Sequence, residues 1–277
     1  MRAVRREGLV TAAGLEHEPE YDEAAIRFLE VVWGEGFLSP GGTDEVDRVL
    51  AGLDLAGKSV LDFGCGAGGI SLHIARKYGP AEVVGYDVEQ PVIDHARAAA
   101  VREGLSSRVR FIASPPGRLP FDDGEFDIVF SKDAMVHVQD KEWLFGELFR
   151  VLKPDGRFAA SDWLISHDGE PSRDMKDYIA AEGLSFGMAS PQRYLTAMTA
   201  AGFADVSAES RNAWYRETAR SELDRLQGSL HAEAAAAVGE EYVAKNIRTW
   251  IAMQKVLDTG EHCPTHLRGS KPAGVSP

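Results

Sequence analysis

The sequence predicts an α/β fold, with a mostly parallel sheet and helices on both of its faces. Short apolar runs alternate with amphipathic helical segments between Val60 and Trp163, the order expected of parallel strands joined by crossover helices. The first run, Val60–Phe63, leads directly into a glycine turn. A backbone without Cβ atoms can turn sharply there and approach a ligand closely. The turn contains Gly64, Gly66, Gly68 and Gly69.

An acidic residue ends the next predicted strand. Asp87 follows the apolar run Val83–Tyr86 and stands roughly twenty residues past the glycine turn, where a carboxylate can accept hydrogen bonds from the hydroxyls of a ribose. Ile70–Tyr78, between them, places apolar residues on one helical face. A glycine turn alone can simply close a strand–helix junction, and its spacing here differs from the dinucleotide fingerprint. The prediction of a ribose-binding site therefore rests on the glycine turn together with the strands on either side of it.

Bulk composition narrows the class of protein. The chain has 277 residues, 44% of them hydrophobic, and a net charge of −13, enough for one α/β core and an appended segment. The negative charge argues against a nucleic-acid partner, and no run of about eighteen apolar residues indicates a membrane partner. Cys65 and Cys263 make neither a disulfide framework nor a zinc cluster. We expect a cytoplasmic protein that binds no metal and is a monomer or homodimer.

One domain is expected over residues 16–268, with disordered tails at 1–15 and 269–277. Residues 16–57 form a helical cap ahead of the first strand, and 164–190 are a polar insertion suited to a substrate lid. The predicted helices are Tyr21–Trp33, Thr43–Leu53 with Thr43 as N-cap, Pro91–Glu103, Lys141–Leu152, Arg173–Glu182, Pro191–Ala201, Arg216–Gly239 and Tyr242–Leu257. The later strands are predicted at Arg108–Ala113, Phe126–Phe130, Phe158–Trp163, Phe203–Glu209 and near His262–Leu267.

A second stretch with chemical potential follows the fourth predicted strand. Asp133 and His137 are four residues apart, so a helical turn beginning here places both on one face above the strand end. A lone histidine is commonly a structural hydrogen-bonding group. Beside an aspartate at a strand's carboxyl end it is also a candidate to hold or remove a proton near pH 7.

The run D-F-G-C-G-A-G-G, together with L-K-P-D-G-R-F at residues 152–158, resembles class I S-adenosylmethionine-dependent methyltransferases, which have a Rossmann-like fold. The resemblance implies S-adenosyl-L-methionine as cofactor and S-adenosyl-L-homocysteine as product. Ser114 stands where such enzymes usually carry an acid for the adenine amino group. The implied cofactor-binding residues are Tyr21, Leu38, Ser39, Asp62, Gly64, Gly66, Asp87, Val88, Ser114, Pro115, Lys132, Asp133 and His137.

A closer resemblance covers Tyr21 to Trp163. The segments FLEVVWGEGFLSPGG and SKDAMVHV are similar to the phosphoethanolamine N-methyltransferases and related to the sarcosine and dimethylglycine N-methyltransferases. The resemblance implies that Tyr21 and His137 form a catalytic dyad, that Asp133 is the motif's aspartate, and that Ser39 lies in a loop over the cofactor. Taken alone, Tyr21 reads as a surface tyrosine at a helix start.

The sequence also departs from that family. Trp163 replaces a tyrosine, and Tyr178 matches a tyrosine that contacts substrate phosphate, but Glu182 and Leu184 stand where an arginine and a tyrosine are expected. A carboxylate in a phosphate site is unfavourable, so another small amine, such as sarcosine or dimethylglycine, is the expected substrate. Trp163, Tyr178 and Arg193 are the predicted substrate residues. Other candidates to bind a carboxylate, or simply solvated charges, are Arg173, Arg211 and Arg216.

The expected activity is methyl transfer to the nitrogen of a small polar amine. Two alternatives stay open. An O-methyltransferase acting on a hydroxylated natural product would use the same histidine as base, and its apolar lid would include Trp163, Leu184, Phe186 and Met188. A non-catalytic protein that binds S-adenosylmethionine and regulates a partner would bind the cofactor without consuming it.

Overall fold

The predicted α/β class is confirmed by the computed structural model, which describes residues 21–184 and 186–274. Within these residues seven strands form one sheet in the order β3-β2-β1-β4-β5-β7-β6, and only β7 runs antiparallel to its neighbours. The predicted tail at 1–15, residues 16–20 of the cap and residues 275–277 lie outside the described residues. The strands are β1 Ser59–Phe63, β2 Glu82–Asp87, β3 Val109–Ala113, β4 Phe126–Lys132, β5 Leu152–Ile165, β6 Ala204–Ser210 and β7 His262–Ser270.

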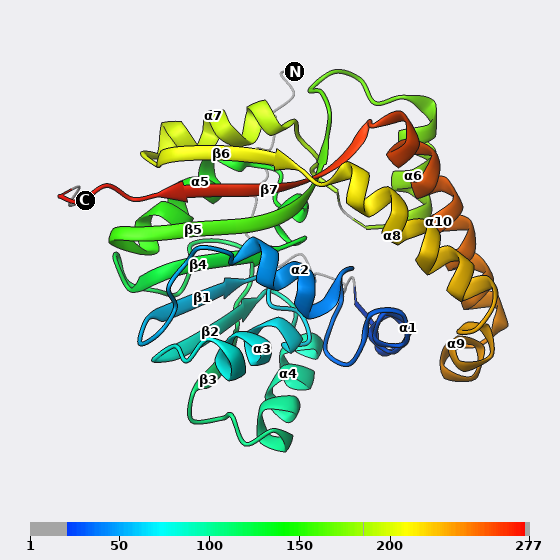
Figure 1. Cartoon of the computed structure of the whole chain (residues 1–277), viewed down its shortest axis with the longest axis horizontal. Helices are drawn as coiled ribbons and strands as arrows, with labels where there is room; N and C mark the ends of the chain where they lie inside the picture. Colours follow the sequence, from blue (N-terminus) through cyan, green and yellow to red (C-terminus); the bar gives the residue numbers. More distant parts are fainter. Residues whose placement is uncertain (1–20, 185, 275–277) are drawn as a thin grey trace, which may run out of the picture.

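Helices cover both faces of the sheet (Figure 1). On one face α2 (Gly42–Val49), α3 (Gly69–Lys77) and α4 (Gln90–Arg102) bury Val46, Ile74 and Ile93 against β1, β2 and β3. On the other, α5 (Lys141–Val151) and α7 (Pro191–Ala201) bury Phe145 and Tyr194. The strands between these layers are buried on both sides, which explains their nearly continuous apolar sequences.

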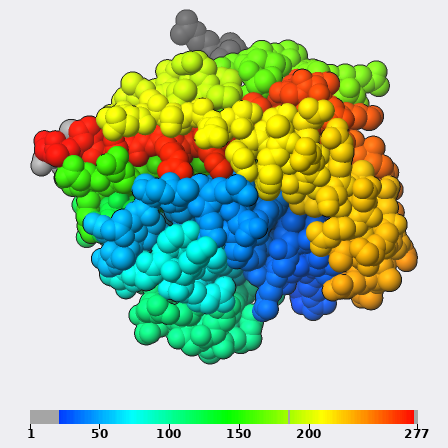
Figure 2. Space-filling model, viewed as in Figure 1, coloured from blue at the N-terminus to red at the C-terminus, as the bar shows by residue number. Residues whose placement is uncertain are grey.

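A separate helical group lies beyond the carboxyl ends of the parallel strands (Figure 1). It consists of α6 (Arg173–Glu182), α8 (Asn212–Gln227), α9 (His231–Val238) and α10 (Glu240–Thr259), with α1 (Glu23–Trp33) packed against them. These helices share a third core that includes Phe28, Tyr178, Tyr215 and Trp250. Figure 2 shows the blue N-terminal elements filling the space between the cyan α3 region and the yellow α8 surface.

Three expectations about local structure are wrong. The helix predicted over Arg216–Gly239 is two helices, because the chain turns after Gln227 and α9 begins only at His231. The N-cap of α2 is Gly41, at φ 88°, and not Thr43. A Cβ at Gly41 would lie 2.8 Å from the Trp214 ring, so this position requires glycine.

The third concerns the C-terminal boundary. Residues 269–271 are ordered, because β7 continues to Ser270 and Lys271 is buried. The Lys271 ammonium donates hydrogen bonds to the carbonyl oxygens of Phe149 and Leu152, at 2.9 and 2.7 Å. Among the described helices none combines the length and apolar character needed to cross a membrane.

Candidate active site

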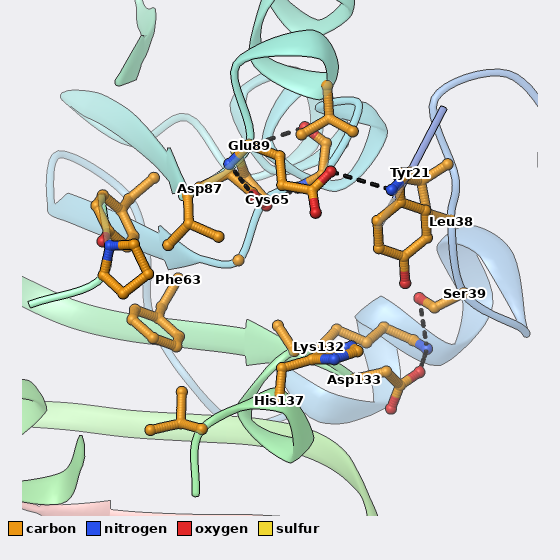
Figure 3. A pocket seen from close by; sticks show the side chains of 18 of the residues that line it. Tyr21, Leu38, Ser39, Phe63, Cys65, Asp87, Glu89, Lys132, Asp133 and His137 are labelled. Atoms are coloured by element: carbon orange, nitrogen blue, oxygen red, sulfur yellow. Dashed lines mark hydrogen bonds and ion pairs between the residues drawn. The ribbon is translucent and has the colours of Figure 1, made fainter. Parts of the chain in front are cut away.

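A cavity of about 380 Å³ opens at the carboxyl ends of β1, β2 and β4. The strand order reverses between β1 and β4, and open α/β sheets bind ligands at such a switch point. Its walls are largely apolar and include Phe63, Tyr86 and Val92, and a few acidic and basic groups project into it (Figure 3). This is the shape and composition of a small-molecule site.

The structure brings most of the predicted site residues together at this cavity. Those that line it are Tyr21, Leu38, Ser39, Gly64, Gly66, Asp87, Val88, Lys132, Asp133 and His137. They come from segments far apart in the sequence: the N-terminal cap, the glycine turn, the end of β2 and the turn after β4. The predicted residues that do not line it are Asp62, Ser114, Pro115, Trp163, Tyr178 and Arg193.

Gly64 begins the turn after β1. Its φ of 73° is one that L side chains rarely adopt, and a Cβ there would lie only 2.1 Å from the Cβ of Ala134. The N–H groups of Gly64 and Cys65 both donate to the carbonyl oxygen of Tyr86, at 2.8 and 3.0 Å. Glycine is thus required because the turn packs directly against the segment that follows β4.

Two carboxylates stand at the end of β2. Asp87 accepts hydrogen bonds from the N–H groups of Gly66 (2.9 Å) and Glu89 (3.0 Å), one on each oxygen. These bonds hold the carboxylate in place, and it keeps lone-pair capacity for a hydroxyl in the cavity. Burial raises the pKa of Asp87, opposed by the hydrogen bonds from Glu89 and Gly66. Glu89 accepts from the N–H of Tyr21 at 3.1 Å (Figure 3), which joins the N-terminal cap to the same end of the cavity.

The loop after α1 closes over the glycine turn. The N–H of Gly69 donates to the carbonyl oxygen of Gly36 at 3.0 Å, and a Cβ at Gly69 would lie 2.7 Å from that oxygen. Further along the loop, the Lys132 ammonium donates to the Ser39 hydroxyl at 3.0 Å and pairs with Asp133 (Figure 3). One buried lysine at the end of β4 thus links the loop to Asp133.

Asp133 and His137 reach the cavity from different backbone geometries. The expected shared helical face is wrong: Asp133 has a φ of 54°, and only Met135–His137 form a 3-10 turn, η1. Aspartate tolerates this left-handed conformation better than most residues. Asp133 is held by its N–H, which donates to the carbonyl oxygen of Ser161 at 2.8 Å.

Buried charges fix the turn that carries His137. The Lys141 ammonium donates to the carbonyl oxygens of Met135 and Val138, and Asp162 accepts from the N–H of Val136 at 3.2 Å. Burial raises the pKa of Asp162 to about 6 and lowers that of Lys141 to about 8. These groups hold the backbone on both sides of His137, so they position its ring.

The predicted residues outside the cavity have other surroundings. Asp62 is fully buried behind the turn and accepts from the Ser71 hydroxyl at 2.6 Å. Pro116 and Gly117, and not Ser114 and Pro115, form the wall beyond β3.

Arg193 is half-exposed and forms an ion pair with Glu142 at 2.8 Å. Trp163 and Tyr178 belong to an aromatic cluster beside the lid.

Sequence reasoning missed several residues that line the cavity, among them Glu89, Phe63 and Trp143. Glu89 lies two positions after Asp87, beyond the end of β2, as the N-cap of α4. Phe63 ends β1 and was assigned only to the strand. Trp143, on α5, is 37% exposed and lines the cavity, which helical periodicity alone could not reveal.

Residues 60–156 match the family model described as a methyltransferase domain. This part of the chain is thus similar to a methyltransferase domain. The matched region runs from β1 into β5 and so includes the glycine turn, Asp87 and the Asp133–His137 segment. It leaves out α1, the lid and the C-terminal helices.

Known proteins resemble the chain over a larger part of its length than this match. Phosphoethanolamine N-methyltransferase 1 of Arabidopsis thaliana is 34% identical over 209 residues, which are 75% of this chain and 41% of that protein. The chain therefore spans about two fifths of that relative's length.

Two solved structures share the fold. One is phosphoethanolamine N-methyltransferase 2 of Haemonchus contortus, in complex with phosphomonomethylethanolamine and S-adenosylhomocysteine. It has a TM-score of 0.82 at 24% identity and covers 89% of this chain and 57% of that one. The other is a protein of Galdieria sulphuraria, provisionally named a sarcosine dimethylglycine methyltransferase. It has a TM-score of 0.78 at 19% identity and covers 91% and 98%.

Proposed function

We propose that the protein transfers a methyl group from S-adenosyl-L-methionine to the nitrogen of a small amine. The observation that carries the proposal is the convergence of two chemistries in one cavity. A carboxylate at the end of β2, Asp87, is suited to ribose hydroxyls, and Asp133 and His137 approach from the turn after β4. The similarity to phosphoethanolamine N-methyltransferases supports nitrogen as the acceptor.

The described residues fit this cofactor. Asp87 offers free lone pairs at a strand end, and Pro116, Val88 and Phe63 provide apolar walls for a base. The glycine turn allows close approach by the amino-acid portion. When bound, the cofactor supplies a sulfonium methyl group that is already a good electrophile. Catalysis by the protein then consists mainly of alignment and exclusion of water.

The chain's own residues have distinct proposed roles. An amine attacks only through its lone pair, so His137 would accept the ammonium proton or keep the nitrogen unprotonated. Asp133, fixed by Lys132, would orient the amine. Tyr21 would act with His137 as the dyad implied by the resemblance, and Ser39 would hold the covering loop.

The test uses purified protein, S-adenosylmethionine and a panel of amines and phenols, analysed by mass spectrometry. One methyl mass gained on an amine, with S-adenosylhomocysteine formed in equal amount, is the expected result. Methylation of phenols alone would replace the proposal with O-methyl transfer. Tight cofactor binding without any transfer would indicate a binding protein.

Location and assembly stay predictions. A cytoplasmic location rests on cysteine usage, since Cys65 and Cys263 are both free and buried. A monomer or homodimer with a small-molecule substrate and no nucleic-acid partner rests on the chain's size and negative charge.

A further inference from the structure

A cluster of aromatic rings lies on the lid side of His137. The His137 ring is 5.6 Å from that of Phe186, which in turn is 5.9 Å from Trp163 and 6.4 Å from Tyr178. His262, at the start of β7, is 5.5 Å from Trp163 and 5.6 Å from Tyr178. We call Trp163, Tyr178, Phe186 and His262, with Glu182 beside them, the lid box.

The lid box adjoins the turn that carries His137. Gly187 packs on the turn that carries His137: its N–H donates to the carbonyl oxygen of Val136, and a Cβ would lie 2.8 Å from the Gln139 amide. Trp163 keeps part of its surface exposed although Phe186 and His262 pack against it. The box therefore packs directly against the catalytic turn, with one of its rings still partly exposed.

Nε2 of His262 is fully buried in the box and has no hydrogen-bond partner. Nδ1 of His262 lies 3.2 Å from the carbonyl oxygen of Leu164, so Nδ1 carries the proton and Nε2 is an acceptor. Burial lowers the pKa of His262 to about 4, which keeps this ring neutral. A buried acceptor without a donor is costly, and a bound ligand could supply one.

The charged group of the box is a carboxylate. Glu182 ends α6 beside the Tyr178 hydroxyl, although the two make no hydrogen bond of normal geometry. Burial raises the pKa of Glu182 to about 7, opposed by Tyr178, Lys245 and His137. Lys245 is an exposed side chain of α10, so the positive charge near Glu182 lies toward solvent.

Anion-binding groups are missing from the described part of the box. Lys132 is already paired with Asp133. The arginines considered from the sequence all have carboxylate partners elsewhere: Arg173 with Asp177, Arg193 with Glu142, Arg211 with Glu45 and Arg216 with Asp258. A phosphate or carboxylate in the box would meet a carboxylate, ring faces and a lone pair, all of them unfavourable.

Resting on the methyl transfer proposed above, we infer that the acceptor is a small amine whose far end donates hydrogen bonds and carries no phosphate or carboxylate, namely an amino alcohol or a diamine. The reacting nitrogen would lie by Asp133 and His137, with the far hydroxyl or ammonium in the lid box. Ring faces attract cations, Nε2 of His262 requires a donor, and an ammonium beside Glu182 would favour the ionised form of its carboxyl.

The experiment compares four acceptors that differ at the far end: ethanolamine, 1,4-diaminobutane, phosphoethanolamine and sarcosine. We expect kcat/KM for ethanolamine or the diamine to exceed that for both anionic amines by about 10-fold or more. Glu182→Gln should lower kcat/KM for the diamine by about 10-fold, chiefly through KM, and affect ethanolamine less. The relative response of the two acceptors separates an ammonium from a hydroxyl.

The matched control is Glu241→Gln, an exposed glutamate on α10, which should leave every acceptor unchanged. Preference for phosphoethanolamine or sarcosine would overturn the inference, as would an unchanged selectivity in Glu182→Gln. Transfer to none of the amines, despite cofactor binding, would instead refute the proposed function. Calorimetry then measures the binding of the same amines to the S-adenosylhomocysteine complex, which tests the inference about the lid box without methyl transfer. Weaker binding of ethanolamine and the diamine than of the anionic amines would refute it.

Discussion

Substituting Gly64 by alanine tests the packing that shapes the glycine turn. The new Cβ would lie 2.1 Å from the Cβ of Ala134, at a backbone φ of 73°. The left-handed backbone costs about 1–2 kcal/mol for an L-residue, and an overpacked contact adds about 1–3 kcal/mol. Together they predict a loss of about 2–5 kcal/mol in the free energy of unfolding.

Gly104 offers a matched control. Its φ is 68°, and no atom lies within 4 Å of the position of its Cβ. Gly104→Ala therefore contains the backbone cost without the clash, about 1–2 kcal/mol. The entropy removed from the unfolded chain is common to both variants and cancels in their difference, which isolates the contact with Ala134.

Urea unfolding of both variants, followed by circular dichroism, supplies the measurement. Adding Ala134→Gly to Gly64→Ala should recover about 1–3 kcal/mol, the part due to the contact. If Gly64→Ala costs no more than Gly104→Ala, or if Ala134→Gly restores nothing, the reasoning about the turn is refuted.

Three further predictions concern buried or reacting charges. Burial raises the pKa of Asp62 to about 7 despite one hydrogen bond, so its stabilising contribution is lost as pH rises from about 4 through 7. The free energy of unfolding of Asp62→Asn should therefore rise relative to that of the wild type over this pH range. A difference that does not change with pH would contradict this. Burial opposes ionisation of Glu45, but hydrogen bonds from His266 and Arg211 lower its pKa to about 2. Glu45→Gln should therefore cost about 3 kcal/mol near pH 7 and less as pH falls from about 4 to 2, measured by denaturant titration. His137→Ala should lower kcat by about 10²–10⁴-fold with little change in cofactor Kd by calorimetry; equal losses of both would make His137 a binding residue.

The central sheet and the cofactor end of the cavity could be predicted because their signals are local. Buried parallel strands have nearly continuous apolar sequences, and Asp87 follows such a run directly. Gly64 and Gly66 occupy positions where a tight turn excludes side chains. Each of these features is determined within a few residues of its own strand.

The lid side depends on contacts between distant segments, which a single sequence does not reveal. Glu182 and His262 are 80 positions apart, and both adjoin Tyr178 only because α6 packs beside the start of β7. Arg193 is a candidate to bind an anion from the sequence alone, but in the structure it forms an ion pair with Glu142. The break between α8 and α9 falls at Gly228, a poor helix former, so this boundary had a local signal in the sequence.

The position of β7 bears on the order in which the chain folds during synthesis. β6 pairs only with β7, although β7 follows it by more than fifty residues. When β6 leaves the ribosome, its partner β7 has not yet been made. The edge of β5 that pairs with β7 is also unpaired at that point. Both edges stay open to wrong partners until α8, α9 and α10 have been made. A single insertion, β7 between β5 and β6, then closes both edges at once.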